Sequence, residues 1–409
     1  MKYEDYVDLK YKPAKDDLVC EFSVEPLGIS LKKAAGAVAS ESSIGTWTET
    51  TTTTKRIEKL HATVFQIHKN IIKISYPIEL FELGNIPQIT SSIAGNIFGM
   101  KVIKNLRLED IYFSRKFIKS FNGPEIGLHD IRKITKIEAR PLIGTIFKPK
   151  IGLTPREMAK YAYSVYSNGI DWSKDDENLT SMRFNKFEDR VIAMLDVIDK
   201  IKSEYGKNVI YAPNTTAPLD TMLNRIQFVK DHGGRCAMID ILTVGWSAVQ
   251  AVREQNFKLI IHAHRASHAA LTKNKKHGIS MLVLAKLSRL IGVSALHSGT
   301  VIGKMHGQKK EVARINNFLR SKWYNIKPVM PIASGGLHPM LIPELVKILG
   351  KDLIINFGGG LWGHPLGPEA GAKAIKQATD ATMQKIQLKT YAKNHEELRV
   401  AIKQWGTPL

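Results

Sequence analysis

Residues 169–178 read GIDWSKDDEN, a short apolar run that ends in one lysine and three consecutive acids. The apolar part has the length and composition of a buried strand. A plain surface loop needs no such cluster of charges, and a protein core tolerates one only when the charges are paired. The stretch therefore predicts a buried strand whose end carries a charged group.

The same kind of run recurs along the chain after Pro141. Each run is followed by a polar or glycine-rich stretch and then by a helical segment. Strands that alternate with helices form a parallel sheet, and eight such units over about 240 residues are typical of a (β/α)₈ barrel. A doubly wound sheet is the alternative. The eight runs are residues 142–147, 169–173, 208–212, 237–242, 258–263, 294–297, 329–334 and 353–357.

The first third of the chain has alternating apolar patterns instead of continuous ones, which indicates an α+β domain. We predict an N-terminal α+β domain with a mixed sheet at residues 1–125. A (β/α)₈ TIM barrel with C-terminal helices is predicted at residues 126–409. Inside the barrel, Thr154 followed by Pro155 and Glu157 predicts a helix start. The N-terminal elements expected are strands at 17–24, 61–77 and 100–112, a helix at 30–40 and a β-prone or loop stretch at 50–54.

Composition limits the function classes. The 409 residues carry 59 Lys and Arg against 38 Asp and Glu, a net charge of +21 that attracts anions. No nucleic-acid-binding module accompanies this charge. Lys286 and Arg289 interrupt the apolar segment 279–296, so it is too charged to span a membrane. With two distant cysteines and no secretory signal, we predict a cytoplasmic protein that binds neither nucleic acid nor membrane.

Charged, amide, imidazole or glycine groups follow seven of the eight runs. Active sites of barrels lie at the C-terminal ends of the strands. One such coincidence means little, but so many together predict a polar crater. The groups are Lys148-Pro149-Lys150, Lys174-Asp175-Asp176-Glu177, Asn214, His262-Ala263-His264-Arg265, His297-Ser298-Gly299, Ser334-Gly335-Gly336 and Gly358-Gly359-Gly360.

The cluster at the second strand end is suited to Mg²⁺. Asp176 and Glu177 offer carboxylate oxygens, the ligands this ion prefers. Lys174 lies two residues before Asp176, so both point the same way on an extended chain. A cationic lysine repels a metal, whereas a lysine that captures CO₂ as a carbamate becomes an anionic ligand. The alternative is a simple Lys–Asp ion pair, which such charge runs commonly form.

Other strand ends suggest phosphate and proton chemistry. The glycines at 335–336 and 358–360 bring main-chain N–H groups close to a phosphate, or they form simple turns. Arg265 and His297 are candidates for a second phosphate, which together suggests a bisphosphate. His264 is a candidate acid–base group. A zinc site of His264 with His268 is the competing interpretation, but a strand-end position argues against it.

The motifs GTIFKPKIGL, GIDWSKDDEN, HAHRASH, HSGTVIGK, ASGG and NFGGG occur in this order. Together they resemble the large subunit of ribulose-1,5-bisphosphate carboxylase/oxygenase (RuBisCO). Residues 35–48 (AGAVASESSIGTWT) and 93–99 (IAGNIFG) resemble the N-terminal active-site segments of the family. The resemblance implies a homodimer whose active sites each combine one barrel with the N-terminal domain of the partner subunit. The short, basic chain is most similar to the archaeal type (form III).

The resemblance also implies roles for individual residues. Lys174 would be the carbamylated lysine that binds one Mg²⁺ per site together with Asp176 and Glu177. The catalytic residues would be Lys148, Lys174, His264 and the mobile-loop Lys304. Independently of the resemblance, the residues themselves favour structural roles for His262 and His268. The substrate-binding residues would be Glu41, Thr46, Trp47, Asn96, Thr145, Lys150, Arg265, His297, Ser334, Gly335, Gly336, Asn356, Phe357, Gly358 and Gly359.

Three departures from the family pattern concern the edges of this site. Met305 and His306 follow Lys304, where the family usually has Leu-Glu. The stretch TETTTTTK after Trp47 is unlike the common sequence, and the few residues after the barrel lead us to expect no long C-terminal tail that latches the loop. These departures bear on loop closure and on discrimination between CO₂ and O₂.

The resemblance implies a Mg²⁺-dependent carboxy-lyase that is also a monooxygenase. It would add CO₂ or O₂ to the enediolate of ribulose 1,5-bisphosphate, the CO₂ reaction giving two molecules of 3-phosphoglycerate. In the archaeal type the substrate comes from AMP salvage. We expect a homodimer or a ring of dimers such as a decamer, without a small subunit. The alternative is a RuBisCO-like enolase or isomerase of a methylthio sugar phosphate.

Overall fold

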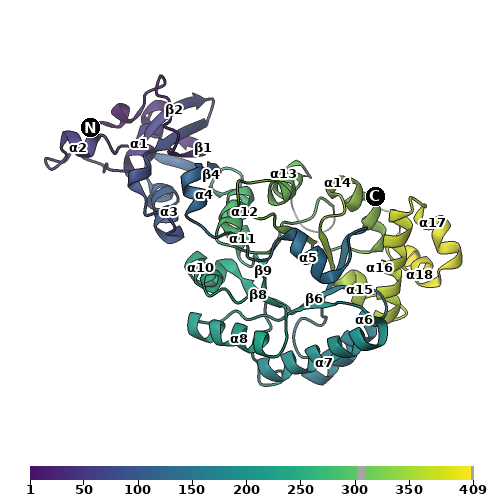
Figure 1. Cartoon of the computed structure of the whole chain (residues 1–409). Helices are drawn as coiled ribbons and strands as arrows, with labels where there is room; N and C mark the ends of the chain where they lie inside the picture. The colour runs from purple at the N-terminus through teal and green to yellow at the C-terminus, as the bar shows by residue number, and fades with distance from the viewer. Residues whose placement is uncertain (303–308, 407–409) are drawn as a thin grey trace. The chain divides into compact units, whose positions relative to one another are not determined.

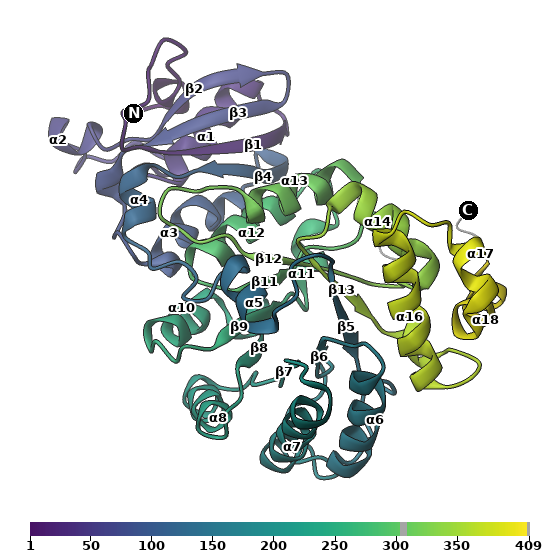
Figure 2. The same cartoon turned by 45° about the vertical axis from the view of Figure 1, so that its right-hand side comes forward.

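The apolar runs of the second part of the chain form a closed parallel sheet. The computed structural model describes residues 1–302 and 309–406. Within these residues the sheet has eight strands in the order β7-β6-β5-β13-β12-β11-β9-β8 (Figures 1 and 2). The strands are β5 (Leu142–Ile146), β6 (Trp172–Lys174), β7 (Ile210–Ala212), β8 (Cys236–Asp240), β9 (Ile260–His264), β11 (Ala295–His297), β12 (Met330–Ser334) and β13 (Ile354–Phe357).

Backbone hydrogen bonds join the two ends of this strand order. Met238 N donates to Pro213 O over 2.8 Å, and Thr215 N donates to Met238 O over 2.9 Å. Strand β8 therefore pairs with the segment that continues β7, and the sheet closes. Each of the eight strands overlaps one of the predicted runs, so the (β/α)₈ barrel is confirmed and the doubly wound sheet is excluded.

Apolar side chains fill the barrel, and one helix covers its N-terminal end. Trp172, Met238 and Ile260 belong to the buried cluster inside the sheet, and Leu128 of α5 (Leu128–Thr135) joins them. Leu128 N donates to Pro328 O, just before β12, so α5 lies where the strands begin. The C-terminal ends of the strands are left for polar side chains.

Helices cover the outer face of the barrel, and α6 and α7 lie side by side there (Figure 2). The start of α6 follows the predicted signal: Thr154 Oγ1 accepts from Glu157 N, and Glu157 Oε2 accepts from Thr154 N. The helices of this part are α6 (Pro155–Ser167), α7 (Phe187–Tyr205), α8 (Leu219–Asp231), α9 (Ile241–Val244), α10 (Trp246–Glu254), α13 (Lys309–Arg320), α14 (Ile342–Leu349), α15 (Gly359–Trp362), α16 (Pro368–Met383), α17 (Leu388–Tyr391) and α18 (Glu396–Trp405).

The first part of the chain forms a mixed sheet with helices. In the described residues this sheet has five strands in the order β10-β4-β1-β3-β2, all pairs antiparallel except β10 with β4. Its strands are β1 (Leu18–Pro26), β2 (Thr63–His68), β3 (Ile71–Tyr76), β4 (Ile103–Tyr112) and β10 (Gly278–Ile279). Its helices are α1 (Leu31–Glu41), α2 (Lys55–Glu58), α3 (Ile86–Ile93), α4 (Arg115–Lys119), α11 (His268–Thr272) and α12 (Met281–Leu290).

The described chain therefore divides into two compact units. One consists of residues 1–122, 267–291 and 324–326, and the other of the described residues within 123–266, 292–302, 309–323 and 327–406. Helix α12 packs with the first unit because Lys286 forms a buried ion pair with Asp110 of β4. The domain boundary expected between residues 125 and 126 stays a prediction. No helix in the described part of the chain is long and apolar enough to cross a membrane.

Candidate active site

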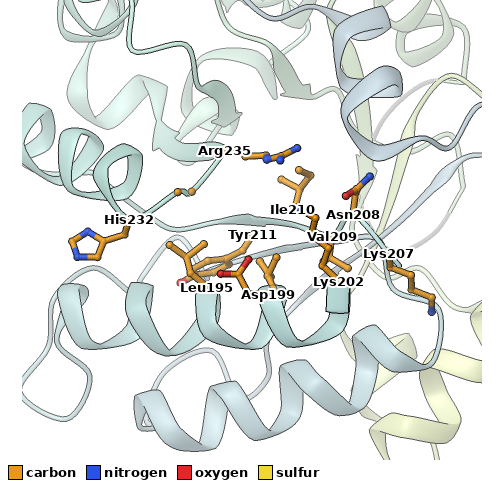
Figure 3. Close-up of a pocket in the computed structure, with 13 residues that line it drawn as sticks. Leu195, Asp199, Lys202, Lys207, Asn208, Val209, Ile210, Tyr211, His232 and Arg235 are labelled. Atoms are coloured by element: carbon orange, nitrogen blue, oxygen red, sulfur yellow. The ribbon is translucent and has the colours of Figure 1, made fainter. Parts of the chain in front are cut away.

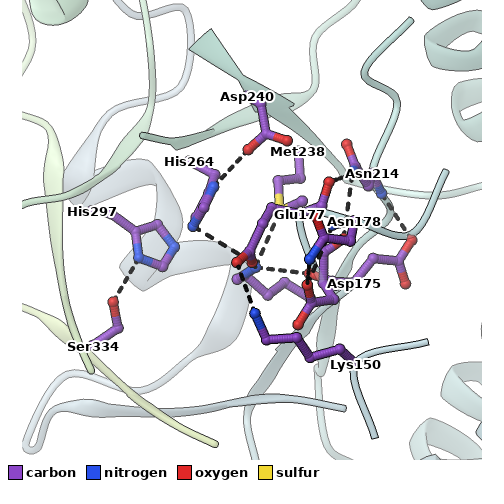
Figure 4. A network of polar contacts seen from close by, with 12 residues as sticks. Lys150, Asp175, Glu177, Asn178, Asn214, Met238, Asp240, His264, His297 and Ser334 are labelled. Carbon is purple, nitrogen blue, oxygen red and sulfur yellow. Dashed lines mark hydrogen bonds and ion pairs between the residues drawn. The ribbon is translucent and has the colours of Figure 1, made fainter. Parts of the chain in front are cut away.

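The polar side chains of the barrel gather at the C-terminal ends of its strands. A separate cavity of about 90 Å³ lies at the opposite end, where Ile210 begins β7 and Arg235 precedes β8 (Figure 3). This cavity is remote from the strand ends that carry carboxylates and imidazoles. The candidate site therefore lies at the C-terminal ends, where Figure 4 shows a network of polar contacts.

The acids that follow β6 point to different sides. Asp175 is fully buried and accepts from Arg190 Nε of α7 over 3.0 Å and from the hydroxyl of Tyr211 over 2.7 Å. It also accepts from Asn214 N over 2.8 Å. Because side chains alternate along an extended chain, Lys174 and Asp176 point to the side opposite Asp175. The anchored Asp175 thus directs its two neighbours toward the barrel mouth.

The amine of Lys174 is buried with weak compensation for its charge. The side chain is almost completely inaccessible, and Nζ donates to Asp175 O over 2.7 Å and to Met238 Sδ over 3.6 Å. Its nearest carboxylate oxygen, Glu177 Oε2, is 3.8 Å away. Burial lowers the pKa of Lys174, and the neighbouring acids oppose this shift. The neutral amine is therefore more accessible here than in an exposed lysine.

Two carboxylates of the network face the lysines of the β5 loop. Lys148 Nζ donates to Asp176 Oδ2 over 2.8 Å, and Lys150 Nζ lies 3.7 Å from Glu177 Oε1. Burial raises the pKa of Glu177, but Lys174, His264 and Lys150 outweigh it and lower the pKa to about 2. Glu177 is consequently anionic at neutral pH.

His264, the last residue of β9, is held by a carboxylate that the sequence analysis did not select. Its Nδ1 lies 2.6 Å from Asp240 Oδ1 at the end of β8, and its Nε2 lies 3.8 Å from Glu177 Oε2 (Figure 4). Burial and the charge of Lys174 lower the pKa of His264, although Asp240 opposes the shift. A neutral ring that donates from Nδ1 to Asp240 leaves a lone pair on Nε2.

The next strand ends contribute His297 and Ser334. His297 Nδ1 lies 2.8 Å from Ser334 Oγ (Figure 4), and its Nε2 lies 2.9 Å from His262 Nε2. Arg265 follows His264 directly, and burial lowers its pKa to about 10, which leaves it cationic at neutral pH. This side of the mouth therefore presents one permanent positive charge beside two neutral imidazoles.

Glycines at the ends of β12 and β13 leave backbone open to the mouth. Gly335 and Gly336 have φ angles of +112° and +68°, which side-chain-bearing residues rarely adopt. A Cβ added at Gly359 would meet open space, whereas at Gly358 it would contact Lys148 Cε at 3.4 Å. These positions leave their backbone accessible to a ligand.

The remaining barrel candidates are less exposed to the mouth. Thr145 Oγ1 donates to Phe357 O and accepts from Trp362 Nε1, so its hydroxyl is already used within the protein. The side chain of Phe357 is part of the buried apolar cluster. Asn356 Oδ1 is buried and has no hydrogen-bond partner among the described residues.

Four candidates lie in the other compact unit. Glu41 ends α1, Thr46 and Trp47 lie in the loop after it, and Asn96 begins a 3₁₀ turn. The side chain of Trp47 is 82% exposed, which is unusual for so large an aromatic ring. Lys304 lies outside the described residues.

The donor set fits a divalent cation under one condition. Asp176 and Glu177 supply carboxylate oxygens, yet no three His, Cys, Asp or Glu side chains in residues 1–302 and 309–406 are arranged to hold a metal ion. Lys174 stands in the third position as a cation. The set becomes suitable for Mg²⁺ when Lys174 carries a carboxylate group.

Three residues that hold other site residues in place were missed or given no role by sequence analysis. Asp240 ends the fourth apolar run, AMIDIL, and its place at a strand end was the available signal. Asn214 was noted at a strand end but given no role; its Nδ2 donates to Asp176 O and Glu177 O. Arg190 lies in the first turn of α7, and no local pattern connects it with Asp175.

Sequence profiles of a known family match both parts of the chain. The profile described as "Ribulose bisphosphate carboxylase large chain, catalytic domain" matches residues 127–405. The profile of the N-terminal domain of the same large chain matches residues 5–117. Together they cover the described sheet of each unit.

Individual relatives match along nearly the whole chain. The ribulose bisphosphate carboxylase of Pyrococcus abyssi is 48% identical over 99% of this chain and 97% of its own length. That of Methanocaldococcus jannaschii is 46% identical over 98% of this chain and 100% of its own length. A solved octameric Rubisco from Pyrococcus horikoshii has a TM-score of 0.96 at 48% identity, over 99% and 97% of the two chains. A dimeric archaeal Rubisco from Hyperthermus butylicus has a TM-score of 0.94 at 44% identity, over 99% and 100%.

The buried pair of Asp175 and Arg190 leads to a stability prediction. Arg190→Met leaves the Asp175 charge buried without its cation, so we expect the free energy of unfolding to fall by about 3–5 kcal/mol. Denaturant unfolding of the purified protein measures this change. Lys200→Met is a matched control on the same helix. Its exposed ion pair with Glu204 spans 3.8 Å, and we expect its loss to cost less than about 1 kcal/mol.

A second substitution separates the charge from the packing. Adding Asp175→Asn to Arg190→Met removes the buried charge and is expected to recover part of the lost stability. Equal unfolding transitions for Arg190→Met and Lys200→Met would contradict the anchoring role of this pair.

Proposed function

The chain belongs to the ribulose bisphosphate carboxylase large-chain family, and we propose that it carboxylates ribulose 1,5-bisphosphate with the strand-end residues of the barrel. One observation carries the proposal: Lys174, Asp176 and Glu177 lie beside the His264–Asp240 pair at one barrel mouth. These groups combine a candidate metal site with a proton acceptor. We also propose that O₂ reacts with the same enediolate in competition with CO₂.

We propose that Lys174, Asp176 and Glu177 hold one Mg²⁺ after Lys174 has reacted with CO₂. The lowered pKa of Lys174 supports this, because only a neutral amine attacks CO₂. Attack of the neutral amine forms the N–C bond and releases one proton to solvent, and the carbamate would place an anion next to Glu177 and Asp176. When bound, Mg²⁺ polarises substrate oxygens and stabilises negative charge that develops on them.

His264 is proposed to accept the proton of the substrate C3 hydroxyl at Nε2. Its pKa is lowered by burial, and Asp240 fixes the other ring nitrogen as the donor. The proton therefore has one defined destination. Lys148, whose Nζ contacts Asp176, is proposed to donate a proton to the carbanion of the carboxylated product.

The two phosphates are proposed to bind on different sides of the mouth. Arg265 supplies charge for one of them, with His297 beside it. The backbone near Gly336, Gly358 and Gly359 would receive the other, together with Thr46 and Trp47. Lys150, half exposed at the mouth, and Ser334 are proposed to contact the sugar between them. Main-chain N–H groups and a guanidinium are suited to this anionic ligand.

The partner subunit is proposed to complete each site. The exposure of Trp47, in a unit separate from the barrel, supports a contact with something outside its own unit. The solved relatives include an octamer from Pyrococcus horikoshii and a dimer from Hyperthermus butylicus. We propose a dimer or an assembly of dimers, and a substrate supplied by nucleotide salvage.

The experiment that tests the function is fixation of labelled CO₂ with ribulose 1,5-bisphosphate and Mg²⁺. We expect acid-stable label in 3-phosphoglycerate, with two molecules formed for each substrate consumed. If the product contains no label and is an isomer of the substrate, the protein is not a carboxylase, and an enolase or isomerase reaction is the better assignment.

Replacement of Lys174 tests the metal site. Lys174→Ala is expected to abolish carboxylation and its activation by CO₂ and Mg²⁺, because two carboxylates alone bind Mg²⁺ weakly. Lys207→Ala is the control, since Lys207 lines the cavity at the other end of the barrel. Wild-type-like carboxylation by Lys174→Ala without an added rescuing acid would rule out the carbamate.

Mixed subunits test the shared site. Lys174→Ala and Asn96→Ala are each expected to be inactive alone but to recover up to about a quarter of the activity after subunit exchange. The fraction follows because half of randomly formed dimers are mixed and one of their two sites is intact. Mixing Lys174→Ala with His264→Ala is the control, in which both sites stay damaged. No recovery despite demonstrated exchange would disprove a shared site.

Lys304 is proposed to stabilise the charge that forms on the incoming CO₂ oxygens. Lys304→Ala is then expected to lower carboxylation by about a hundredfold or more, the scale of removing one such donor. Exchange of the substrate C3 proton with solvent precedes this step and should remain measurable. If exchange and carboxylation fall equally, Lys304 acts in substrate binding instead.

A further inference from the structure

Two buried imidazoles contact each other inside the barrel, next to the proposed substrate site. His262 Nε2 lies 2.9 Å from His297 Nε2, and His297 Nδ1 lies 2.8 Å from Ser334 Oγ. The two histidines are 1% and 2% exposed. They and the serine come from β9, β11 and β12, which are neighbours in the sheet. The contacts form one chain from the barrel interior to its mouth.

Both rings are neutral at physiological pH. Burial lowers the pKa of His262 and His297 well below the ordinary histidine value, and nearby positive groups add to the shift. A neutral imidazole has one N–H and one lone pair. A hydrogen bond between two Nε2 atoms therefore has two possible directions, and each direction fixes both tautomers.

The surroundings of His262 favour one direction. Its Nδ1 is buried without a partner among the described residues. If His297 donated to His262, this Nδ1 would carry a buried N–H without an acceptor, which proteins tolerate less often than an unused lone pair. The ring of Trp172 lies beside His262, with centroids 5.9 Å apart. The Trp172 N–H also has no acceptor in the described residues, and an indole cannot accept from a histidine.

We infer that His262 is a positioning residue that donates from Nε2 to His297 and thereby holds His297 as the Nδ1–H tautomer. His297 then donates to Ser334 Oγ (Figure 4). Because Ser334 Oγ accepts the hydrogen bond from His297, the Ser334 O–H is left to donate to a different acceptor. We assign that acceptor as an oxygen of the bound sugar bisphosphate, which rests on the proposed function.

This assignment changes the part that His297 plays. Both of its ring nitrogens are used within the protein, so it has no additional N–H for a phosphate. Its effect on the substrate passes through Ser334, while Arg265 carries the charge. His262, which the sequence analysis treated as structural, then sets the direction of a substrate hydrogen bond from the barrel interior.

The tautomer can be measured on the intact wild-type protein without an activity assay. Solid-state NMR of protein labelled with ¹⁵N-histidine distinguishes protonated from unprotonated ring nitrogens, and His297→Gln identifies the His297 signals by their loss. We expect protonated Nδ1 and unprotonated Nε2 in His297. The reverse pattern, or a doubly protonated ring, overturns the inference, whether or not the protein proves to be a carboxylase.

Substitutions at position 262 test the effect on substrate. His262→Leu removes the donor and is expected to raise KM for ribulose 1,5-bisphosphate about tenfold, the scale of one neutral hydrogen bond. His262→Gln keeps an N–H group that reaches the same place, so it should restore most of the loss. Trp172→Phe is the control, since its N–H has no acceptor in the described residues. Equal KM values for folded Leu and Gln variants overturn the inference.

Discussion

The buried ion pair between Asp175 and Arg190 is the contact on which the geometry of the barrel mouth depends. Four charged residues, 174–177, follow one another at the end of the short strand β6. On an extended chain, neighbouring side chains point to opposite sides. Arg190, Tyr211 and the backbone of Asn214 hold Asp175. Removal of Arg190 would leave the buried charge of Asp175 uncompensated. The side chains of Lys174 and Asp176 would then no longer be held in their present orientation.

Electrostatics at the mouth follow from that direction. The side chain of Lys174 is buried, and its amine lies near Met238 Sδ and 3.8 Å from the closest Glu177 oxygen. Burial lowers the pKa of this amine. Glu177 is surrounded by Lys174, His264 and Lys150 and stays anionic. An amine that is easily neutral is able to react with CO₂, and the resulting carbamate would place a further anion beside the carboxylates, an arrangement that favours a divalent cation.

The barrel could be predicted from the sequence because each strand is a separate apolar run, and closure of the sheet brings the ends of those runs together. Strand β10 could not, since two residues are too few to show a period. Arg190 and Asp240 were missed for a related reason. Their roles depend on partners in other elements, and no local pattern records the pairing. Trp47 could be selected from the sequence only by resemblance. Its exposed ring adds a physical reason to expect that it contacts a ligand or a partner. Lys304 lies outside the described residues.

The most direct test of this account is detection of the carbamate itself. The protein would be equilibrated with ¹³CO₂ and Mg²⁺, and bound ¹³C would be observed by NMR in the wild type and in Lys174→Ala. The account predicts a carbamate signal in the wild type that is absent from Lys174→Ala. Absence of the signal from the wild type, or its persistence in Lys174→Ala, would contradict the proposed origin of the third metal ligand.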